Sequence, residues 1–241
     1  MNFTPFLSPC DEPRARRTLE ALRRHATHRW VLTGGMAIEL HMLRHGCATS
    51  SRPLNDLDFL VNTFDEIPPT LSDDLLFRHV HPLDPPAKTL LQAVNPQTKV
   101  RVDVFRAYGD IVSRAVPVEL YGSEMPVISG EDVAARCARL CIGLATGEQV
   151  PAKRARDFLR LLRLTSRSKI EPIWQEHRKA NHPHSFREVA ALLRDLFIAR
   201  QELLTTPQYS QDLHAHCARC VHSAYFPLAS AARIHSLLGY C

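Results

Sequence analysis

The sequence predicts an α+β protein, with a mixed β-sheet flanked by helices in its first half and an all-helical C-terminal half. Up to about residue 128, short apolar runs alternate with polar residues and are separated by Gly, Pro and Asn, a pattern typical of strands and turns. From Ser129 onward, apolar residues recur at helical spacing instead. We therefore expect two domains, an α/β core over residues 1–128 and a helical domain over residues 129–241.

In the first half, residues 11–28 are predicted to form a helix because acidic residues and a proline stand in the first turn, with apolar residues at helical spacing behind them. A short buried strand, Trp30–Thr33, is followed by two glycines and a second helix that stops at Gly46. The turn sequence "NPQT" predicts a hairpin. The remaining strands are expected over residues 57–62, 89–94, 100–105, 116–120 and 125–128.

In the second half, Ser129 is the expected N-cap of a helix that begins with "GEDVAARCARL". Pro151 stands in the expected first turn of the next helix, "PAKRARDFLRLLRL". Three or four further helices are expected before Cys241.

The composition fits a folded domain rather than a disordered chain, with 45% hydrophobic and 23% charged residues among 241. The sequence contains no apolar run long enough to span a bilayer, and its first residues lack the basic-then-apolar order of a signal peptide. Seven irregularly spaced cysteines fit a reducing compartment better than a disulfide framework. We therefore expect a cytoplasmic protein with no membrane partner.

The charge is unevenly distributed along the chain. Residues 1–150 carry 16 Lys/Arg and 18 Asp/Glu, whereas residues 151–241 carry 14 and 7. A basic half beside an acidic one suits a polyanionic ligand such as a nucleotide or RNA. A solvated helical surface would give the same split, so the charge only supports other observations.

Two carboxylates stand one residue apart in "RPLNDLDFLV", a stretch that otherwise has the pattern of a buried strand. Because residues i and i+2 of a strand share a face, Asp56 and Asp58 are expected to lie side by side and to repel each other unless a cation intervenes. Asp103 in "VRVDVF" would join them if the hairpin strand lies beside this one. Alternatively, Asp103 is an ion-pair partner of Arg101.

A double glycine separates a strand from a helix in "LTGGMAIEL". Glycine lets the backbone approach a ligand closely, and the N-terminus of a helix is electropositive, so Gly34 and Gly35 suit phosphate binding. A tight turn is the plainer interpretation, and it is compatible with phosphate binding.

The order of these motifs resembles the DNA polymerase β-like nucleotidyltransferase superfamily, and within it the stand-alone bacterial proteins of the AbiEii/AbiGii toxin type. The matching positions are Gly34, Gly35, Arg52, Asp56, Asp58 and Asp103, and the likeness covers roughly residues 25–165. It departs from the family pattern at Met36, Leu54, Arg136 or Cys137, and Arg160.

The resemblance implies a nucleotidyltransferase-type sheet and magnesium-dependent transfer of a nucleoside monophosphate from an NTP to a hydroxyl, with release of pyrophosphate. Asp56, Asp58 and Asp103 would form the catalytic site and hold two Mg²⁺ ions. The expected nucleotide-binding residues are Thr33, Gly34, Gly35, Arg52, Lys153 and Asp157. Lys153 is included because a cation in the first turn of a helix opposes the dipole unless an anion compensates; Asp157 either orients a neighbour or forms a structural ion pair.

The toxin-type likeness makes RNA, including tRNA, an expected acceptor and an antitoxin protein an expected partner. Two alternatives remain open: a nucleotide-binding regulatory module that has lost turnover, and an antibiotic-modifying enzyme of the aminoglycoside type.

One further cluster could bind a metal. In "HAHCARCVH", the candidate ligands are His214, Cys217, Cys220 and His222. Structural zinc usually draws ligands from two separate segments, and no second Cys/His pair has matching spacing, so a packed helix is the default expectation.

Overall fold

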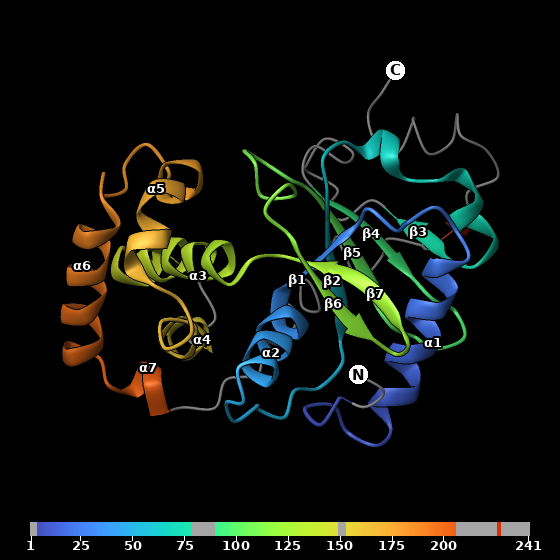
Figure 1. Cartoon of the computed structure of the whole chain (residues 1–241), viewed down its shortest axis with the longest axis horizontal. Coiled ribbons are helices and arrows are strands. Elements are labelled where there is room, and N and C mark those ends of the chain that lie inside the picture. The colour runs from blue at the N-terminus through green and yellow to red at the C-terminus, as the bar shows by residue number, and fades with distance from the viewer. Residues whose placement is uncertain (1–3, 79–89, 149–152, 206–225, 228–241) are drawn as a thin grey trace. The chain divides into compact units, whose positions relative to one another are not determined.

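The computed structural model describes residues 4–78, 90–148, 153–205 and 226–227 (Figure 1). The chain divides into two compact units. The first comprises Met1–Ala37, Ser50–Val127 and Gln211–Cys241, and the second Ile38–Thr49 and Ile128–Ser210. Within the described ranges, every helix is too short or too polar to cross a membrane.

The first unit contains a mixed sheet in the order β6-β7-β1-β2-β5-β4-β3-β8. Its strands are β1 (Val31–Thr33), β2 (Asp56–Val61), β3 (Leu76–Arg78), β4 (Leu90–Val94), β5 (Arg101–Arg106), β6 (Val116–Leu120), β7 (Ser123–Val127) and β8 (Phe226–Pro227). At its centre, β2 runs antiparallel to β1 and parallel to β5, and β4 returns antiparallel beside β5. The predicted hairpin is therefore confirmed as β4–β5.

The strand register brings the polar side chains of the sheet centre to one face. Asp58 of β2 lies opposite Thr33 of β1 and opposite Asp103 of β5, and Gln92 of β4 lies opposite Asp103 on its other side. Residues paired across neighbouring strands point to the same face. Four neighbouring strands thus each contribute one polar residue to the same row.

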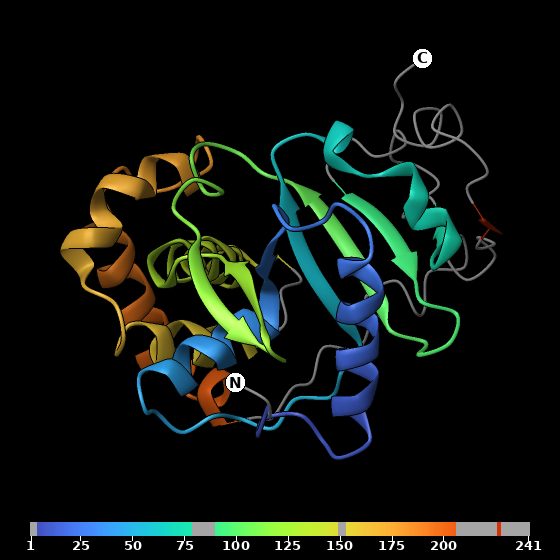
Figure 2. The same ribbon diagram turned by 45° about the vertical axis from the view of Figure 1, so that its right-hand side comes forward.

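The other face of the same strands is apolar and carries helix α1 (Asp11–Arg23) (Figure 2). Phe59 of β2 is buried, and its ring centroid lies 5.7 Å from that of Trp30. Leu22 of α1 lines a cavity of about 230 Å³ together with these two rings. The alternation of Asp56, Leu57, Asp58 and Phe59 therefore separates a polar face from an apolar core within one strand.

The first helix is shorter than predicted, ending at Arg23 rather than near residue 28. The hydroxyl of Thr27 donates to the Leu22 carbonyl at 2.8 Å and satisfies an acceptor that the next helical turn would have used. Such side-chain bonds to the backbone compete with helix continuation.

Helix α2 (Gly34–Arg44) begins directly after β1, so both glycines fall in its first turn instead of preceding it. Its predicted stop is confirmed. Gly46 follows the helix with a φ of +65°, and the Cys47 amide donates to the Met42 carbonyl at 2.8 Å. A glycine in the left-handed region with this bond is a common helix terminus.

The second unit is built around α3 (Gly130–Ala145), which contacts α4 (Lys153–Leu161), α5 (Arg167–His177) and α6 (Phe186–Ala199). A short α7 (Glu202–Thr205) follows. Ser129 is the N-cap of α3, as predicted, because its side chain accepts from the Asp132 amide. The core is aromatic, with the Phe186 ring 5.9 Å from Trp174 and 6.3 Å from Phe158.

Two buried polar pairs join elements within this unit. His177 of α5 lies 2.8 Å from Asp132 of α3, and both side chains are fully buried. Arg160 of α4 makes two bonds to the carboxylate of Glu39 in α2, at 2.6 and 2.7 Å. Bidentate arginine–carboxylate pairs fix geometry as well as charge.

The structure departs from the expected all-helical C-terminal half at its end. Phe226–Pro227 forms β8, which pairs antiparallel with β3 of the sheet. β3 itself and two 3₁₀ turns, Phe64–Glu66 and Pro69–Asp73, were also not predicted. The candidate zinc ligands His214, Cys217, Cys220 and His222 lie outside the described residues, as does Pro151.

Candidate active site

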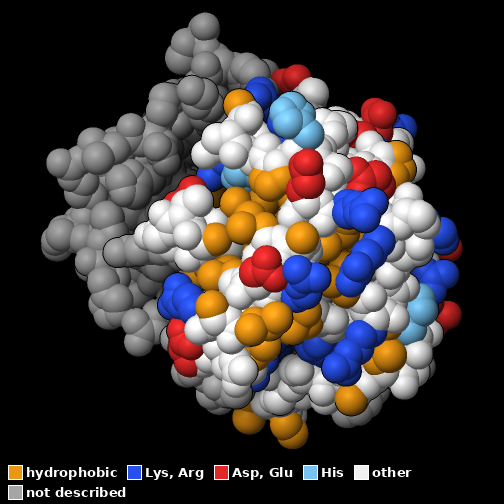
Figure 3. Space-filling model, turned by 90° about the vertical axis from the view of Figure 1, so that its left-hand side faces the viewer, with side chains coloured by type: hydrophobic (Ala, Val, Ile, Leu, Met, Phe, Trp, Pro, Cys, Tyr) orange, Lys and Arg blue, Asp and Glu red, His pale blue; other side chains and the backbone are white. Residues whose placement is uncertain are grey.

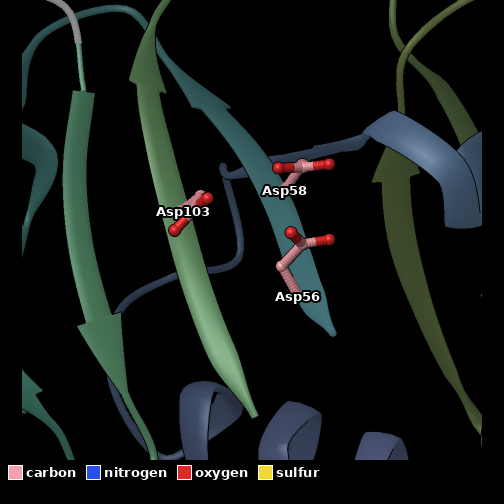
Figure 4. Close-up of side chains that lie close together, drawn as sticks. All are labelled: Asp56, Asp58 and Asp103. Atoms are coloured by element: carbon pink, nitrogen blue, oxygen red, sulfur yellow. The ribbon is translucent and has the colours of Figure 1, made fainter. Parts of the chain in front are cut away.

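Three carboxylates converge on one face of the sheet. Asp56 and Asp58 project from β2 and Asp103 from the adjacent β5 (Figure 4). One carboxylate oxygen from each of the three lies within 4.8 Å of the others. The parallel pairing of β2 with β5 that this convergence required is present, with Asp58 directly opposite Asp103.

The backbone at Gly34 makes room for one of these carboxylates. Gly34 has a φ of +70°, and a Cβ added there would lie 1.9 Å from Oδ2 of Asp58. Real Cβ atoms do not approach an oxygen so closely, so any side chain at this position would displace the carboxylate. The first glycine is required both by its backbone conformation and by the packing of Asp58 against it.

The second glycine lies against Arg52. A Cβ added at Gly35 would lie 3.3 Å from the Nη1 atom of Arg52. The guanidinium therefore stands beside the first turn of α2, where backbone N–H groups are not used by the helix. Thr33 ends β1 immediately before these glycines and is buried. Thr33, Gly34, Gly35 and Arg52 are thus adjacent, as a phosphate site needs.

Arg101 supplies a cation to the carboxylates from within the chain. Arg101 lies two residues before Asp103 on β5 and shares its face of the sheet. Its Nη2 donates to Oδ2 of Asp56, and its Nε lies 3.2 Å from Oδ1 of Asp103. The ion pair between Asp103 and Arg101, the alternative that the sequence left open, is therefore present. It exists together with the convergence of the three carboxylates.

Gln92 approaches Asp103 from β4. It is 1% exposed, and its Nε2 donates to Oδ1 of Asp103 at 2.9 Å. Sequence reasoning missed this residue. The signal that could have found it is the hairpin register, because pairing Val94 with Arg101 places Gln92 opposite Asp103.

Burial and charge change the ionisation of Asp103. Removal from water raises the pKa of its carboxyl to about 7; Arg101 opposes the rise, the charges of Asp58 and Asp56 add to it, and the Gln92 hydrogen bond opposes it. In the metal-free protein this carboxyl therefore holds a proton more tightly than an exposed aspartate does.

The donor set fits a divalent cation. Three carboxylates within 4.8 Å offer hard oxygen ligands of the kind that magnesium prefers, and a concentration of negative charge that a cation would relieve. The glycine cradle for Asp58 shows that the backbone accommodates this arrangement. The site could therefore hold a metal ion.

Two predicted nucleotide-binding residues belong to the second unit. Lys153 is the first residue of α4 and is half-buried. Asp157, in the same helix, is 3% exposed, and its Oδ1 lies 3.9 Å from Nη1 of Arg160. Asp157 therefore takes part in an ion pair within its own unit.

The residues at the four departures from the family pattern are either buried or hold a buried partner. Met36 and Leu54 are 7% and 6% exposed, and they contribute to the core of the first unit. Cys137 is buried in α3, and Arg160 holds Glu39. The cysteines of the described ranges are free thiols, at positions 10, 47, 137 and 141.

Neither a protein-family model nor a curated protein matches the sequence. Among solved structures, the chain is similar to an antigenic nucleotidyltransferase-like protein from Paracoccidioides brasiliensis, with 16% identity and a TM-score of 0.47 over 82% of this chain and 94% of that one. JHP933 from Helicobacter pylori gives 15% identity and a TM-score of 0.40 over 83% and 79%.

A Megavirus polyadenylate synthase gives 14% identity and a TM-score of 0.44 over 61% of this chain. The chain spans only 31% of the length of that viral protein. Because all three TM-scores are below 0.5, the function has to be argued from the site itself.

Proposed function

We propose that the protein is a magnesium-dependent nucleotidyltransferase that transfers a nucleoside monophosphate from an NTP to a hydroxyl acceptor. One observation carries the proposal: three carboxylates from two adjacent strands converge within 4.8 Å, one of them in a cradle that only glycine can form. Three carboxylates this close repel one another, and a bound cation would relieve that repulsion.

In this proposal each carboxylate has a defined task. Asp56, Asp58 and Asp103 would hold two magnesium ions. The bound ions supply positive charge that favours deprotonation of the attacking hydroxyl and holds the triphosphate. Asp103 accepts the hydroxyl proton while the hydroxyl oxygen bonds to the α-phosphorus and the bond to the β-phosphate breaks. Pyrophosphate leaves as the second product.

The triphosphate would be bound by the first turn of α2. The proposed contacts are the backbone of Gly34 and Gly35, the hydroxyl of Thr33 and the guanidinium of Arg52, which lies against Gly35. Lys153 and Asp157, which belong to the second unit, are proposed as further nucleotide-binding residues.

For the acceptor we propose RNA, including tRNA. The support is the charge of the helical half, where exposed Lys and Arg side chains lie among apolar ones (Figure 3). Exposed cations on described helices and turns of this unit include Arg163, Arg167, Lys169 and Arg187. The toxin-type resemblance extends the proposal to a protein antitoxin, which co-expression of the neighbouring gene product and co-purification would test.

A second candidate is a nucleotide-binding module without turnover. The observation in its favour is Arg101, whose guanidinium already contacts Asp56 and Asp103 and so provides some of the charge compensation that a metal would give. Such a module would bind nucleotide but release no pyrophosphate.

The test is incubation with each α-labelled NTP, magnesium and either total RNA or an aminoglycoside, with Asp58→Asn as the control. Label on RNA with pyrophosphate release, absent in the variant, supports the proposal. Label on the aminoglycoside supports a drug-modifying enzyme. Nucleotide binding with no label on either acceptor favours the second candidate.

A further inference from the structure

Gln92 places a neutral hydrogen-bond donor next to the proposed general base. It lies on β4, which flanks β5 on the side away from β2. An amide as buried as this one is costly unless its polar atoms are paired. In a strand where the neighbouring Leu91 and Ala93 are apolar and buried, an apolar residue would fill the same space without that cost.

The bond from Gln92 acts on one oxygen of Asp103. Oδ1 accepts from Nε2 of Gln92 at 2.9 Å and has the Nε atom of Arg101 3.2 Å away. In Figure 4, one oxygen of Asp103 points toward Asp58 and the other points away from β2. Anchoring Oδ1 removes the rotational freedom of the carboxylate and leaves the second oxygen to the shared site.

Arg101 and Gln92, the two partners of Asp103, differ in charge. This difference decides which of them can remain bound to Asp103 when a metal ion enters the site. The Arg101 guanidinium is a cation between two carboxylates, so a metal ion entering the same site is repelled by it. The amide of Gln92 carries no net charge. It can therefore keep its bond to Oδ1 when a metal ion binds at the other oxygen.

We propose that Gln92 is a positioning residue that orients the carboxylate of Asp103 for metal binding and proton transfer. The expected effect of Gln92 on the reaction rests on the proposed function. The expected effect of Gln92 on metal binding does not. Residues that hydrogen-bond to a metal-binding carboxylate fix its orientation, and their loss typically costs about 10- to 100-fold in metal affinity or activity.

The test compares Gln92→Met, which keeps the length and shape of the side chain but removes the donor, with Leu91→Val. Leu91 is buried in the same strand, but it is paired with Val104 and faces the opposite side of the sheet. Both variants disturb β4, and only the first touches Asp103. Gln92→Asn, whose side chain is one methylene shorter and so draws the amide back from Oδ1, serves as a second variant if Gln92→Met does not fold.

The first measurement is the affinity of the metal-free protein for Mn²⁺, with electron paramagnetic resonance used to detect binding. We expect binding about 10-fold weaker or more in the Gln92 variants and unchanged in Leu91→Val. In a transfer assay, kcat should fall by a similar factor while KM for the NTP stays nearly constant. If Gln92 has only a structural role, the Gln92 variants will bind Mn²⁺ as tightly as Leu91→Val and have the same kcat. That result would overturn the inference.

The two proposals fail in distinguishable ways. If the wild-type protein transfers no nucleotide, the proposed function fails, and the Mn²⁺ titration still decides the role of Gln92. If the wild-type protein is active but the Gln92 variants match Leu91→Val in both measurements, only the positioning role fails.

Discussion

At the residue scale, the ionisation of Asp103 links the structure most directly to chemistry. Its carboxyl is buried beside two other carboxylates, and its pKa is raised to about 7 in the folded chain. The corresponding value in an unfolded chain is near 3.8. The folded state therefore binds the proton more tightly than the unfolded state, and the metal-free protein should lose stability when this proton is removed.

We predict that the metal-free protein becomes less stable relative to Asp103→Asn as the pH rises. The pKa of Asp103 is higher in the folded state than in the unfolded state, so protonation of Asp103 stabilises the fold. This stabilisation is complete below the unfolded pKa and is lost as the pH rises through the folded pKa, between about pH 4 and pH 7. The variant has no proton to lose at this position. Thermal melting of both proteins in chelator measures the effect as a difference in Tm, and a difference that is constant with pH would contradict it.

At the element scale, the junction between β1 and α2 is where backbone geometry and site chemistry meet. At Gly34, the φ of +70° would strain any other residue, and the Asp58 carboxylate occupies the space that a Cβ would take. Gly46, after the end of the same helix, has a similar φ of +65°, but a Cβ added there would meet nothing within 4 Å. Replacing Gly46 therefore measures the cost of the left-handed backbone alone, whereas replacing Gly34 adds the cost of the clash with Asp58.

We predict that Gly34→Ala weakens Mn²⁺ binding and is more destabilising than Gly46→Ala. Both variants pay roughly 1–3 kcal/mol for the left-handed backbone, but only the first pushes the Asp58 carboxylate away. Urea unfolding gives the stabilities, and Mn²⁺ titration reports the site. Equal Mn²⁺ affinity in the two variants would show that Asp58 does not depend on the glycine.

In the helical unit, the contact between α4 and α2 rests on the Arg160–Glu39 pair. The Glu39 side chain is completely buried, and both of its oxygens accept from the guanidinium. Truncating one member of such a pair leaves a buried charge without that compensation and typically costs about 3–5 kcal/mol.

We therefore predict that Arg160→Met is strongly destabilising, and that the double variant Glu39→Leu/Arg160→Met recovers most of the loss. A double-mutant cycle in urea measures the coupling between the two positions. If Arg160→Met unfolds at the same urea concentration as the parent, the pair contributes little, and a ligand contact would become the better explanation of this arginine.

At the scale of the whole molecule, the positions of the three carboxylates could be predicted from sequence because two simple rules suffice. Asp56 and Asp58 share a face through the period of two, and Asp103 joins them once β5 lies beside β2. Gln92 was missed because its contact with Asp103 follows from the register of the hairpin, which the position of the turn alone does not give. Arg101 was considered only as a partner of Asp103, because its second contact, with Asp56, depends on side-chain conformation.

The ends of elements were the weaker part of the prediction for similar reasons. The first helix stops at Arg23 because of a hydroxyl several residues beyond its end, and β8 exists only through its pairing with β3. Both depend on partners that local periodicity does not reveal. The role of Arg160 depends on Glu39, which lies 121 residues away in sequence.

The central claim is that metal and nucleotide complete one site on the three carboxylates. Metal alone has to compete with Arg101, whereas metal and triphosphate supply ligands to each other. The direct measurement is the Tm shift with Mg²⁺, with a non-hydrolysable triphosphate, and with both, for the wild-type protein and Asp58→Asn. The account predicts a combined shift larger than the sum of the separate ones in the wild-type protein, since ligands that bind the native state stabilise it, and loss of this excess in the variant. Separate shifts that simply add, or an excess that survives Asp58→Asn, would contradict it.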